Sequence, residues 1–364
     1  AYDTYSNMLL NIGGSGLLYG VTGSGKTQVY LKLIDKALEN DRDVIVLVPE
    51  ISLTPQVLSI FHARYGDKVA VFHSGLSLGE RNDEYKRADR GEAKIVIGTR
   101  SAVFAPLHNL GLIIMDEEQE NTYKSERTPK YNTKDVAHFR CKYNKALFLM
   151  TSATPSLETY SNALKGKYVL CELNERFGDA KLPHVITVDM KQEMKNGNKS
   201  PISSKLKELI SETIDNGKQA ILLINRRGYN TFIACNDCGH VITCPNCSIS
   251  LTYHSTNNRL TCHYCGYTKS LDNVCPECHS ENIRYSGYGT QKIEDELSYL
   301  FPNARILRMD ADTTSAKFSH EKLFNAFANH EYDIMIGTQM VAKGLDFDNV
   351  TLVGVVNADN SLYD

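Results

Sequence analysis

The sequence predicts an α/β protein with two lobes, each built on a doubly wound parallel sheet, and a small metal-binding module inserted in the second lobe. Three observations support this fold class. Short apolar runs alternate with helix-like stretches, a polar segment separates two such series, and eight of the ten cysteines form four C-x-x-C pairs. The apolar runs are continuous rather than alternating, which is typical of parallel strands covered by helices on both faces.

Six apolar runs in the first half and four in the second half predict the strands. Between the first two runs, Val29, Leu33, Ile34 and Leu38 recur at helical spacing and predict an amphipathic helix. Strands are expected at 17–21, 44–48, 69–72, 95–97, 112–115 and 147–150, and then at 220–224, 306–309, 334–336 and 352–356. The predicted domains are a first lobe over 1–165, a connector over 166–204, a second lobe over 205–234 and 279–364, and a metal module over 235–278.

The composition is that of a globular protein. Apolar residues make up 42% and charged residues 23% of the 364 residues, and no apolar run approaches the roughly 18 residues that span a bilayer. The formal net charge of −3 argues against a strongly basic surface, so any DNA contact must rely on local patches. The first twenty residues lack the pattern of a secretory signal, and we expect a monomeric cytoplasmic protein with no membrane partner.

A phosphate-binding loop is predicted where the first strand ends. Residues 20–27 read Gly-Val-Thr-Gly-Ser-Gly-Lys-Thr and fit G-x-x-x-x-G-K-[ST] at every position, between a strand and an amphipathic helix. Glycines let main-chain N–H groups converge on phosphate oxygens, and the helix start adds favourable partial charge. We expect ATP to be bound by Gly23, Ser24, Gly25, Lys26 and Thr27, with Lys26 on the β/γ-phosphates and Thr27 on Mg²⁺.

The strand at 112–115 ends in Asp116-Glu117-Glu118-Gln119. Because the carboxyl ends of parallel strands meet at one edge of a sheet, an Asp at this position can hold Mg²⁺ opposite the phosphate loop. We expect Asp116 to bind the metal and Glu117 to activate the attacking water. Without the phosphate loop, an acidic helix start would explain the same residues equally well.

Further motifs at strand ends resemble those of superfamily 2 helicases. They are 49–56 (Pro-Glu-Ile-Ser-Leu-Thr-Pro-Gln), 73–75 (His-Ser-Gly), 98–102 (Gly-Thr-Arg-Ser-Ala), 151–155 (Thr-Ser-Ala-Thr-Pro), 337–340 (Gly-Thr-Gln-Met) and 343–346 (Lys-Gly-Leu-Asp). The cysteine block narrows the resemblance to the primosomal replication-restart helicases. Two further segments support it, 225–229 (Asn-Arg-Arg-Gly-Tyr) and 287–291 (Gly-Tyr-Gly-Thr-Gln). The resemblance covers nearly the whole chain after residue 17 and implies two RecA-like P-loop NTPase lobes.

This resemblance implies a 3′-to-5′ DNA helicase that acts at stalled or abandoned replication forks, in replication restart and primosome assembly. The implied partners are branched or single-stranded DNA, primosome proteins and single-stranded DNA-binding protein. Strand-end Ser and Thr side chains also have a plainer explanation as helix caps. The residues implied by the family are Thr151, Ser152 and Ala153 for coupling of hydrolysis to lobe movement, Gly344 and Asp346 for ATP and Mg²⁺, and Ser74, Thr99, Arg100 and Thr338 for the DNA backbone.

Three departures from the family pattern affect these expectations. Gln119 stands where His is common, and it can form hydrogen bonds but cannot titrate. The family's Arg-rich motif VI is not found, since Arg308 is the last arginine of the chain. The amino-terminal DNA-binding region and the adenine-reading segment are also not found. Because an arginine finger contributes ~10³–10⁵ in rate, we expect this chain to bind nucleotide but to hydrolyse it slowly.

The cysteine pairs predict two structural zinc ions. Two C-x-x-C turns supply four thiolates, which complete one tetrahedral site. Spacing alone leaves the pairing open, although a hairpin predicted between 251–253 and 259–261 favours one site from the inner four cysteines, and the family supports this nested arrangement. The expected ligands are Cys235, Cys238, Cys275 and Cys278 for one ion and Cys244, Cys247, Cys262 and Cys265 for the other.

Two sets of aromatic residues are candidate DNA contacts. In the module, Tyr253, Tyr264 and Tyr267 either pack the ribbon or stack on bases. Residues 122–142 carry six basic and two acidic side chains with interleaved aromatics, which predicts a DNA-sensing loop beside the acidic motif. A solvated helix face is the alternative for this segment. The candidate contacts in the loop are Tyr123 and Tyr131.

Two other functions fit the same motifs. The chain could serve as a primosome assembly platform in which the zinc module recruits proteins and the motor acts as an ATP switch. It could also be a double-strand DNA translocase, although the cysteine block makes this interpretation weaker. Loss of Lys26 separates the first alternative from a helicase, because a platform would still assemble partners without ATP.

Overall fold

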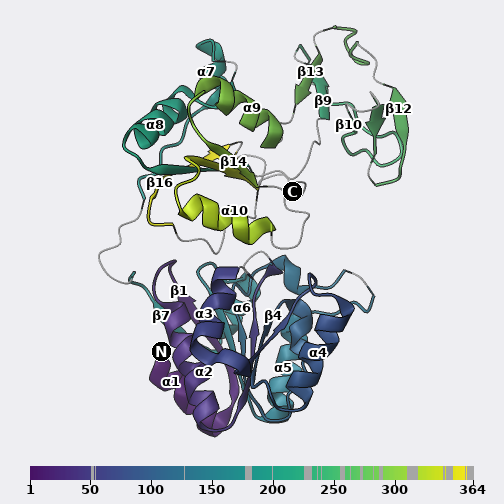
Figure 1. The fold of residues 1–364 in the computed structure, drawn as a ribbon. Coiled ribbons are helices and arrows are strands. Elements are labelled where there is room, and N and C mark those ends of the chain that lie inside the picture. The colour runs from purple at the N-terminus through teal and green to yellow at the C-terminus, as the bar shows by residue number, and fades with distance from the viewer. Residues whose placement is uncertain are drawn as a thin grey trace. The chain divides into compact units, whose positions relative to one another are not determined.

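The computed structural model describes residues 1–50, 53, 55–126, 128–176, 183–198, 200–224, 232–235, 237–238, 240–254, 259–262, 264–270, 274–281, 283–286, 290–309, 319–338, 341, 347–356 and 358. The chain forms two compact units, Ala1–Val185 and Ile186–Asp364 (Figure 1). In the described part of the chain, no helix is long and apolar enough to cross a membrane.

The first unit is built on a seven-stranded parallel sheet with the order β3-β4-β2-β5-β6-β1-β7. Its central strands are fully buried, as expected from their continuous apolar runs. The strands are β1 (Gly14–Gly20), β2 (Asp43–Leu47), β3 (Val69–Phe72), β4 (Ile95–Gly98), β5 (Leu110–Met115), β6 (Leu147–Ser152) and β7 (Val169–Leu173).

Helices cover both faces of this sheet, and neighbouring residues of one strand face opposite cores. Leu18 of β1 lies in a core with residues of α1, α2 and α3, whereas Leu17 lies in a core with residues of α4, α5 and α6. The helices are α1 (Tyr2–Asn7), α2 (Lys26–Glu39), α3 (Pro55–Tyr65), α4 (Leu78–Asp89), α5 (Thr133–Asn144) and α6 (Leu157–Leu164), with short helical turns η1 (Met8–Ile12), η3 (Gly66–Lys68), η4 (Arg100–Phe104) and η5 (Asn121–Tyr123).

Strand β7 differs from the sequence prediction, which placed 166–204 in a connector. The strand pairs in parallel with β1 and completes the sheet edge. Its residues are only partly buried, and Glu172 interrupts the apolar run, so the sequence signal was weak. The polar segment that follows contains only the short helix α7 (Met190–Lys195) before α8 (Ser204–Asp215) begins, within the residues that the structure describes there.

The second unit contains a four-stranded parallel sheet with the order β14-β15-β8-β16. Strand β8 precedes the cysteine block and the other three follow it, so the block is an insertion into one sheet, as predicted. The elements of this sheet and its helices are β8 (Gln219–Ile224), α9 (Thr290–Leu300), β14 (Ile306–Met309), α10 (Ser319–Ala328), β15 (Ile334–Gly337) and β16 (Val350–Val356).

The inserted module contains two small antiparallel sheets. The predicted hairpin is present, because β10 pairs with β11 and β11 pairs with β12. A small core of Ile233, Ile242, Leu251 and Leu260, with Cys244 and Cys262, lies beside them. The strands are β9 (Phe232–Cys235) paired with β13 (Ile283–Ser286), and β10 (Thr252–His254), β11 (Arg259–Thr261) and β12 (Thr268–Ser270).

Candidate functional site

The predicted phosphate loop lies between β1 and α2. Gly23 and Gly25 adopt φ of 78° and 84°, a left-handed region that favours glycine, and a Cβ on either would meet nothing within 4 Å. Gly25 is the N-cap of α2 and makes no side-chain cap, so no capping side chain satisfies the first N–H groups of the helix. This arrangement suits an anion, because the helix start carries favourable partial charge and no capping side chain occupies its first N–H groups.

Lys26 begins α2 and folds back over the loop. Its Nζ donates to the carbonyl oxygens of Gly20 at 2.6 Å and Val21 at 3.3 Å. Burial lowers the pKa of Lys26, while the carboxylates of Glu117 and Asp116 act in the opposite direction. The amine is therefore held at the loop, within electrostatic reach of the acidic residues that follow β5.

Asp116 lies directly after β5, and sheet order explains its position. Because β6 lies between β5 and β1, the carboxyl ends of these strands bring Asp116, Thr151 and the phosphate loop to one edge. Asp116 Oδ1 accepts hydrogen bonds from Thr151 Oγ1 at 2.5 Å and from Glu117 N at 3.1 Å. Burial raises the pKa of Asp116, and the Thr151 hydrogen bond opposes that rise. The carboxylate oxygens of Asp116 fit an Mg²⁺ ion, which prefers oxygen ligands.

Gln119 connects the acidic motif to the end of β6. Its Nε2 donates to Glu117 Oε2 at 2.6 Å, and its Oε1 accepts from Ser152 Oγ at 2.6 Å. Ser152 Oγ in turn accepts from the main-chain N–H of Thr154 at 2.8 Å. Only this amide orientation satisfies both partners, since a carboxylate can only accept. The side chain thus joins the predicted catalytic carboxylate to the segment predicted to couple hydrolysis to lobe movement.

Glu118 forms a buried network that the sequence did not reveal. Its side chain has no exposed surface and forms an ion pair with Lys134 of α5. Its oxygens also accept from Ser156 N at 2.7 Å, Ser156 Oγ at 3.2 Å and Thr159 Oγ1 at 2.9 Å, at the start of α6. Glu118 therefore fixes α5 and α6 to the acidic motif. The signal in the sequence was only a third carboxylate, and nothing there separates it from a solvated residue.

The predicted DNA-sensing loop is partly structural. Tyr123 is 3% exposed, and its hydroxyl donates to the carbonyl oxygens of Asp116 at 2.7 Å and Leu47 at 3.0 Å. This geometry contradicts a stacking role for Tyr123. Lys134 is bound to Glu118, and Arg140 donates to the carbonyls of Val103 and Ala105. Tyr131 remains half-buried.

The predicted backbone contacts fall into two groups. Ser74 is exposed, and Arg100 is partly exposed with its guanidinium bonded to the Lys124 carbonyl at 3.0 Å. Thr99 and Thr338 are each 4% exposed, which favours a structural part for these side chains over a phosphate contact. Gly344 and Asp346, predicted for ATP and Mg²⁺, lie outside the described residues, as do 225–229 and 287–289.

Thr99 and Thr338 occupy matching turns in the two units, a repeat that sequence analysis missed. Gly98 ends β4 and Gly337 ends β15, and in both cases a Cβ would clash with the carbonyl oxygen at the end of the neighbouring strand. The N–H three residues after each Thr returns to the Thr carbonyl, at 2.8 Å for Ala102 and 3.0 Å for Val341. The shared signal, Ile-x-Ile-Gly-Thr, is short and easily overlooked.

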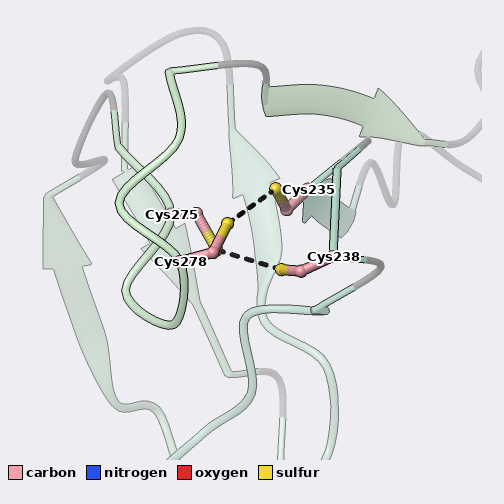
Figure 2. Close-up of side chains that lie close together, drawn as sticks. All are labelled: Cys235, Cys238, Cys275 and Cys278. Carbon is pink, nitrogen blue, oxygen red and sulfur yellow. Dashed lines mark hydrogen bonds between the residues drawn. The ribbon is translucent and has the colours of Figure 1, made fainter.

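The eight paired cysteines form two clusters. Cys235 and Cys238 meet Cys275 and Cys278 (Figure 2), and within this cluster Sγ atoms approach to 3.5 and 3.6 Å. The inner cluster joins Cys244, Cys247, Cys262 and Cys265, with the Cys244 and Cys265 sulfurs 3.6 Å apart. Tetrahedral Zn²⁺ with Zn–S bonds near 2.3 Å requires sulfurs about 3.8 Å apart, so both donor sets fit the ion. This is the nested pairing.

Comparisons with known proteins identify the family. Residues 5–163 match the profile of DEAD/DEAH box helicases, and residues 244–269 match the PriA DNA helicase Cys-rich region (CRR) domain. The replication restart protein PriA of Bacillus subtilis (strain 168) is 53% identical over 347 residues, which are 95% of this chain. The chain belongs to the PriA family. The PriA of Haemophilus influenzae is 40% identical over 361 residues, or 99% of the chain.

The chain spans less than half of these PriA proteins, 43% of the Bacillus protein and 49% of the Haemophilus protein. Solved structures with a similar fold include RecG bound to a three-way DNA junction and the helicase MrfA bound to DNA. Their TM-scores are 0.52 and 0.56, at 15% and 14% identity, over 97% and 98% of this chain and 37% and 44% of theirs. At such identities the likeness shows the fold alone, which is that of RecA-like helicase lobes.

Proposed function

We propose that this PriA-family chain is the ATP-driven core of a 3′-to-5′ DNA helicase that acts at stalled or abandoned forks in replication restart. The supporting observation is that Lys26, Asp116 and Thr151 meet at one sheet edge beside an uncapped helix start. ATP would bind there as substrate, with Mg²⁺ held by Asp116 and Thr27. The expected DNA substrate is branched or single-stranded.

The roles of the residues follow from their contacts. Lys26 neutralises charge on the β/γ-phosphates, and the main-chain N–H groups of residues 23–27 hold the phosphate oxygens. Glu117 accepts the proton of the attacking water. Gln119 links Glu117 to Ser152 by hydrogen bonds, and the Ser152 hydroxyl extends this link to the main chain at Thr154. A movement of the Glu117 side chain would therefore be transmitted to this turn. Glu118 holds the acidic motif in place against α5 and α6 through Lys134 and Ser156.

The zinc ions are proposed to be structural. The module has a small apolar core, so two Cys₄ sites would supply much of its folding free energy. Tyr253 and Tyr267 pack against this core, whereas Tyr264 is 84% exposed. The module therefore retains one free aromatic side chain for a partner or for DNA.

The test uses this chain and its Lys26→Ala variant. Calorimetry with a non-hydrolysable ATP analogue and Mg²⁺ should show binding by the parent chain and a loss of at least tenfold in the variant. Forked DNA with a 3′ or a 5′ single-stranded tail then tests strand separation and its polarity. No binding of the analogue by the parent chain would refute the proposal.

A further inference from the structure

A buried tyrosine, Tyr30, lies one helical turn after the phosphate loop. It is 4% exposed and belongs to the core on the face of the sheet that α2 covers. Burial raises the pKa of its hydroxyl. Transfer of a hydroxyl into such a core is unfavourable unless the group finds a hydrogen-bond partner. The identity of that partner therefore bears on the role of the Tyr30 hydroxyl.

The partner is Thr27, the residue predicted to bind Mg²⁺. The two residues are three positions apart on α2, so they share one face of the helix. Long side chains in a helix lean toward its N-terminus, which brings the Tyr30 hydroxyl back to Thr27. A side-chain hydrogen bond joins the two and opposes the burial-induced rise in the pKa of Tyr30. This direction indicates that Thr27 is the donor, since a hydrogen bond donated to the phenol oxygen favours its deprotonated form.

Asp116 places this pair of hydroxyl groups at the metal site. Tyr30 lies within electrostatic reach of Asp116, whose negative charge raises the pKa of Tyr30 further. The core that contains Tyr30 also contains Leu112 and Ile114 of β5, the strand that ends just before Asp116. Thr27 is exposed, whereas Tyr30 is not. The Tyr30 hydroxyl thus reaches the site from the core, and the Thr27 side chain lies at the surface.

A threonine hydroxyl that binds Mg²⁺ still has a proton to donate. Coordination uses a lone pair of the oxygen, so the O–H group remains a hydrogen-bond donor. Asp116 Oδ1 already accepts from Thr151 Oγ1 and from Glu117 N. The Tyr30 oxygen can take the proton of Thr27 without competing for this carboxylate oxygen. The hydrogen bond between Thr27 and Tyr30 is therefore compatible with metal binding.

We propose that Tyr30 is a positioning residue for Mg²⁺, because its phenol oxygen accepts the hydrogen bond of Thr27 and so directs the lone pairs of the Thr27 hydroxyl into the metal site. The proposal rests on the proposed function and adds a residue outside the phosphate-loop motif. In a helix the threonine hydroxyl divides between two rotamers, and the hydrogen bond to Tyr30 favours one of them. Tyr30 acts through Thr27 and not on the phosphates, so its effect should depend on the metal.

The experiment measures the binding of AMP-PNP to this chain by calorimetry, once with Mg²⁺ and once with EDTA. Tyr30→Phe keeps the ring and removes only the hydroxyl. It should weaken binding about three- to tenfold in Mg²⁺, the range of one hydrogen bond, and leave binding in EDTA unchanged. Tyr65→Phe is the matched control, since the Tyr65 hydroxyl also contacts α2, where it donates to Leu31 O at 3.2 Å and Asp35 Oδ1 at 3.0 Å. It should change neither affinity.

A second variant shows whether Tyr30 acts through Thr27. Thr27→Val keeps the β-branched shape and removes the hydroxyl, so the gain in affinity from Mg²⁺ should fall. Addition of Tyr30→Phe to Thr27→Val should cause no further loss, because the hydrogen bond is already absent. A further loss in the double variant would overturn the proposal. Circular dichroism and urea unfolding without nucleotide verify that each variant is folded.

The outcomes distinguish this proposal from the proposed function. Equal losses in Mg²⁺ and in EDTA, or no loss in Tyr30→Phe, would overturn the role of Tyr30 and leave nucleotide binding at the loop intact. If the parent chain did not bind AMP-PNP under either condition, the proposed function would fail, and the role of Tyr30 with it.

Discussion

The buried ion pair between Lys134 and Glu118 offers a quantitative test of how α5 and α6 are held. Replacing Lys134 with Met keeps an unbranched side chain of similar length but leaves the Glu118 carboxylate buried without its cation. Loss of one partner of a buried pair costs about 3–5 kcal/mol. Lys134 retains 21% exposure, and three hydrogen bonds from Ser156 and Thr159 remain on the carboxylate, so we expect about 3 kcal/mol.

The double variant Lys134→Met/Glu118→Gln provides the decisive comparison. The amide can still accept from Ser156 N and can donate to Thr159, but it carries no charge. Most of the lost free energy, about 2 kcal/mol, should therefore return. Urea unfolding gives the stability, and hydrogen exchange in residues 156–160 locates the effect at the start of α6. Lys142→Met, an exposed lysine on the same helix, is the control.

Two results would refute this reasoning. One is a Lys134→Met stability within 0.5 kcal/mol of the parent, the range of ordinary surface changes, since such a value would mean that the pair contributes like a surface contact. The other is a double variant less stable than Lys134→Met. Exchange that increases equally throughout the first unit would place the effect outside α6.

Three further predictions follow from the site. Thr151→Val removes the hydrogen bond that opposes the burial-induced rise in the pKa of Asp116. Because Mg²⁺ needs the deprotonated carboxylate, the affinity for Mg²⁺–nucleotide should begin to fall at a higher pH in this variant. Calorimetry from pH 5 to 8 measures this affinity, and an unchanged pH profile would mean that the hydrogen bond is unimportant. Gln119→Leu should reduce DNA stimulation of ATP hydrolysis several-fold without changing nucleotide affinity, and equal loss of both would contradict the Gln119 connection. A zinc chelator should unfold the module, because the two cysteine clusters would lose their ions. Hydrogen exchange should become faster in residues 240–270 and stay unchanged in the central strands of the first unit. An equal increase in exchange throughout the chain would argue against structural zinc.

The regular elements around the site were predictable from sequence because their signals are local. Continuous apolar runs identified the six strands before β7, and the glycine-rich motif identified the loop before α2. Strand β7 was missed since it is a half-exposed edge strand, which in the described sheet pairs with β1 on one side. An edge strand needs few apolar residues, so its pattern resembles a connector.

The candidate site was predictable in its residue types but not in its connections. Asp116, Glu117 and Lys26 follow from motifs, whereas the Glu118–Lys134 pair joins residues that no local pattern relates. Tyr123 was placed wrongly at the surface, because an aromatic residue among charged neighbours has the same sequence signature whether its ring faces solvent or the core.

The nesting of the two cysteine clusters sets an order of assembly on the ribosome. The inner four ligands have all been synthesised once Cys265 emerges, while the outer site must wait for Cys278, whose partner Cys235 was made 43 residues earlier. The inner ligand set is therefore available for zinc before the outer set, which joins the two ends of the module. Because β8 precedes the module and β14 follows it, the outer site joins the two points at which the module leaves a single sheet. Closure of the outer site thus bears on the pairing of β8 with β15 and β16, strands that lie on either side of the module in sequence.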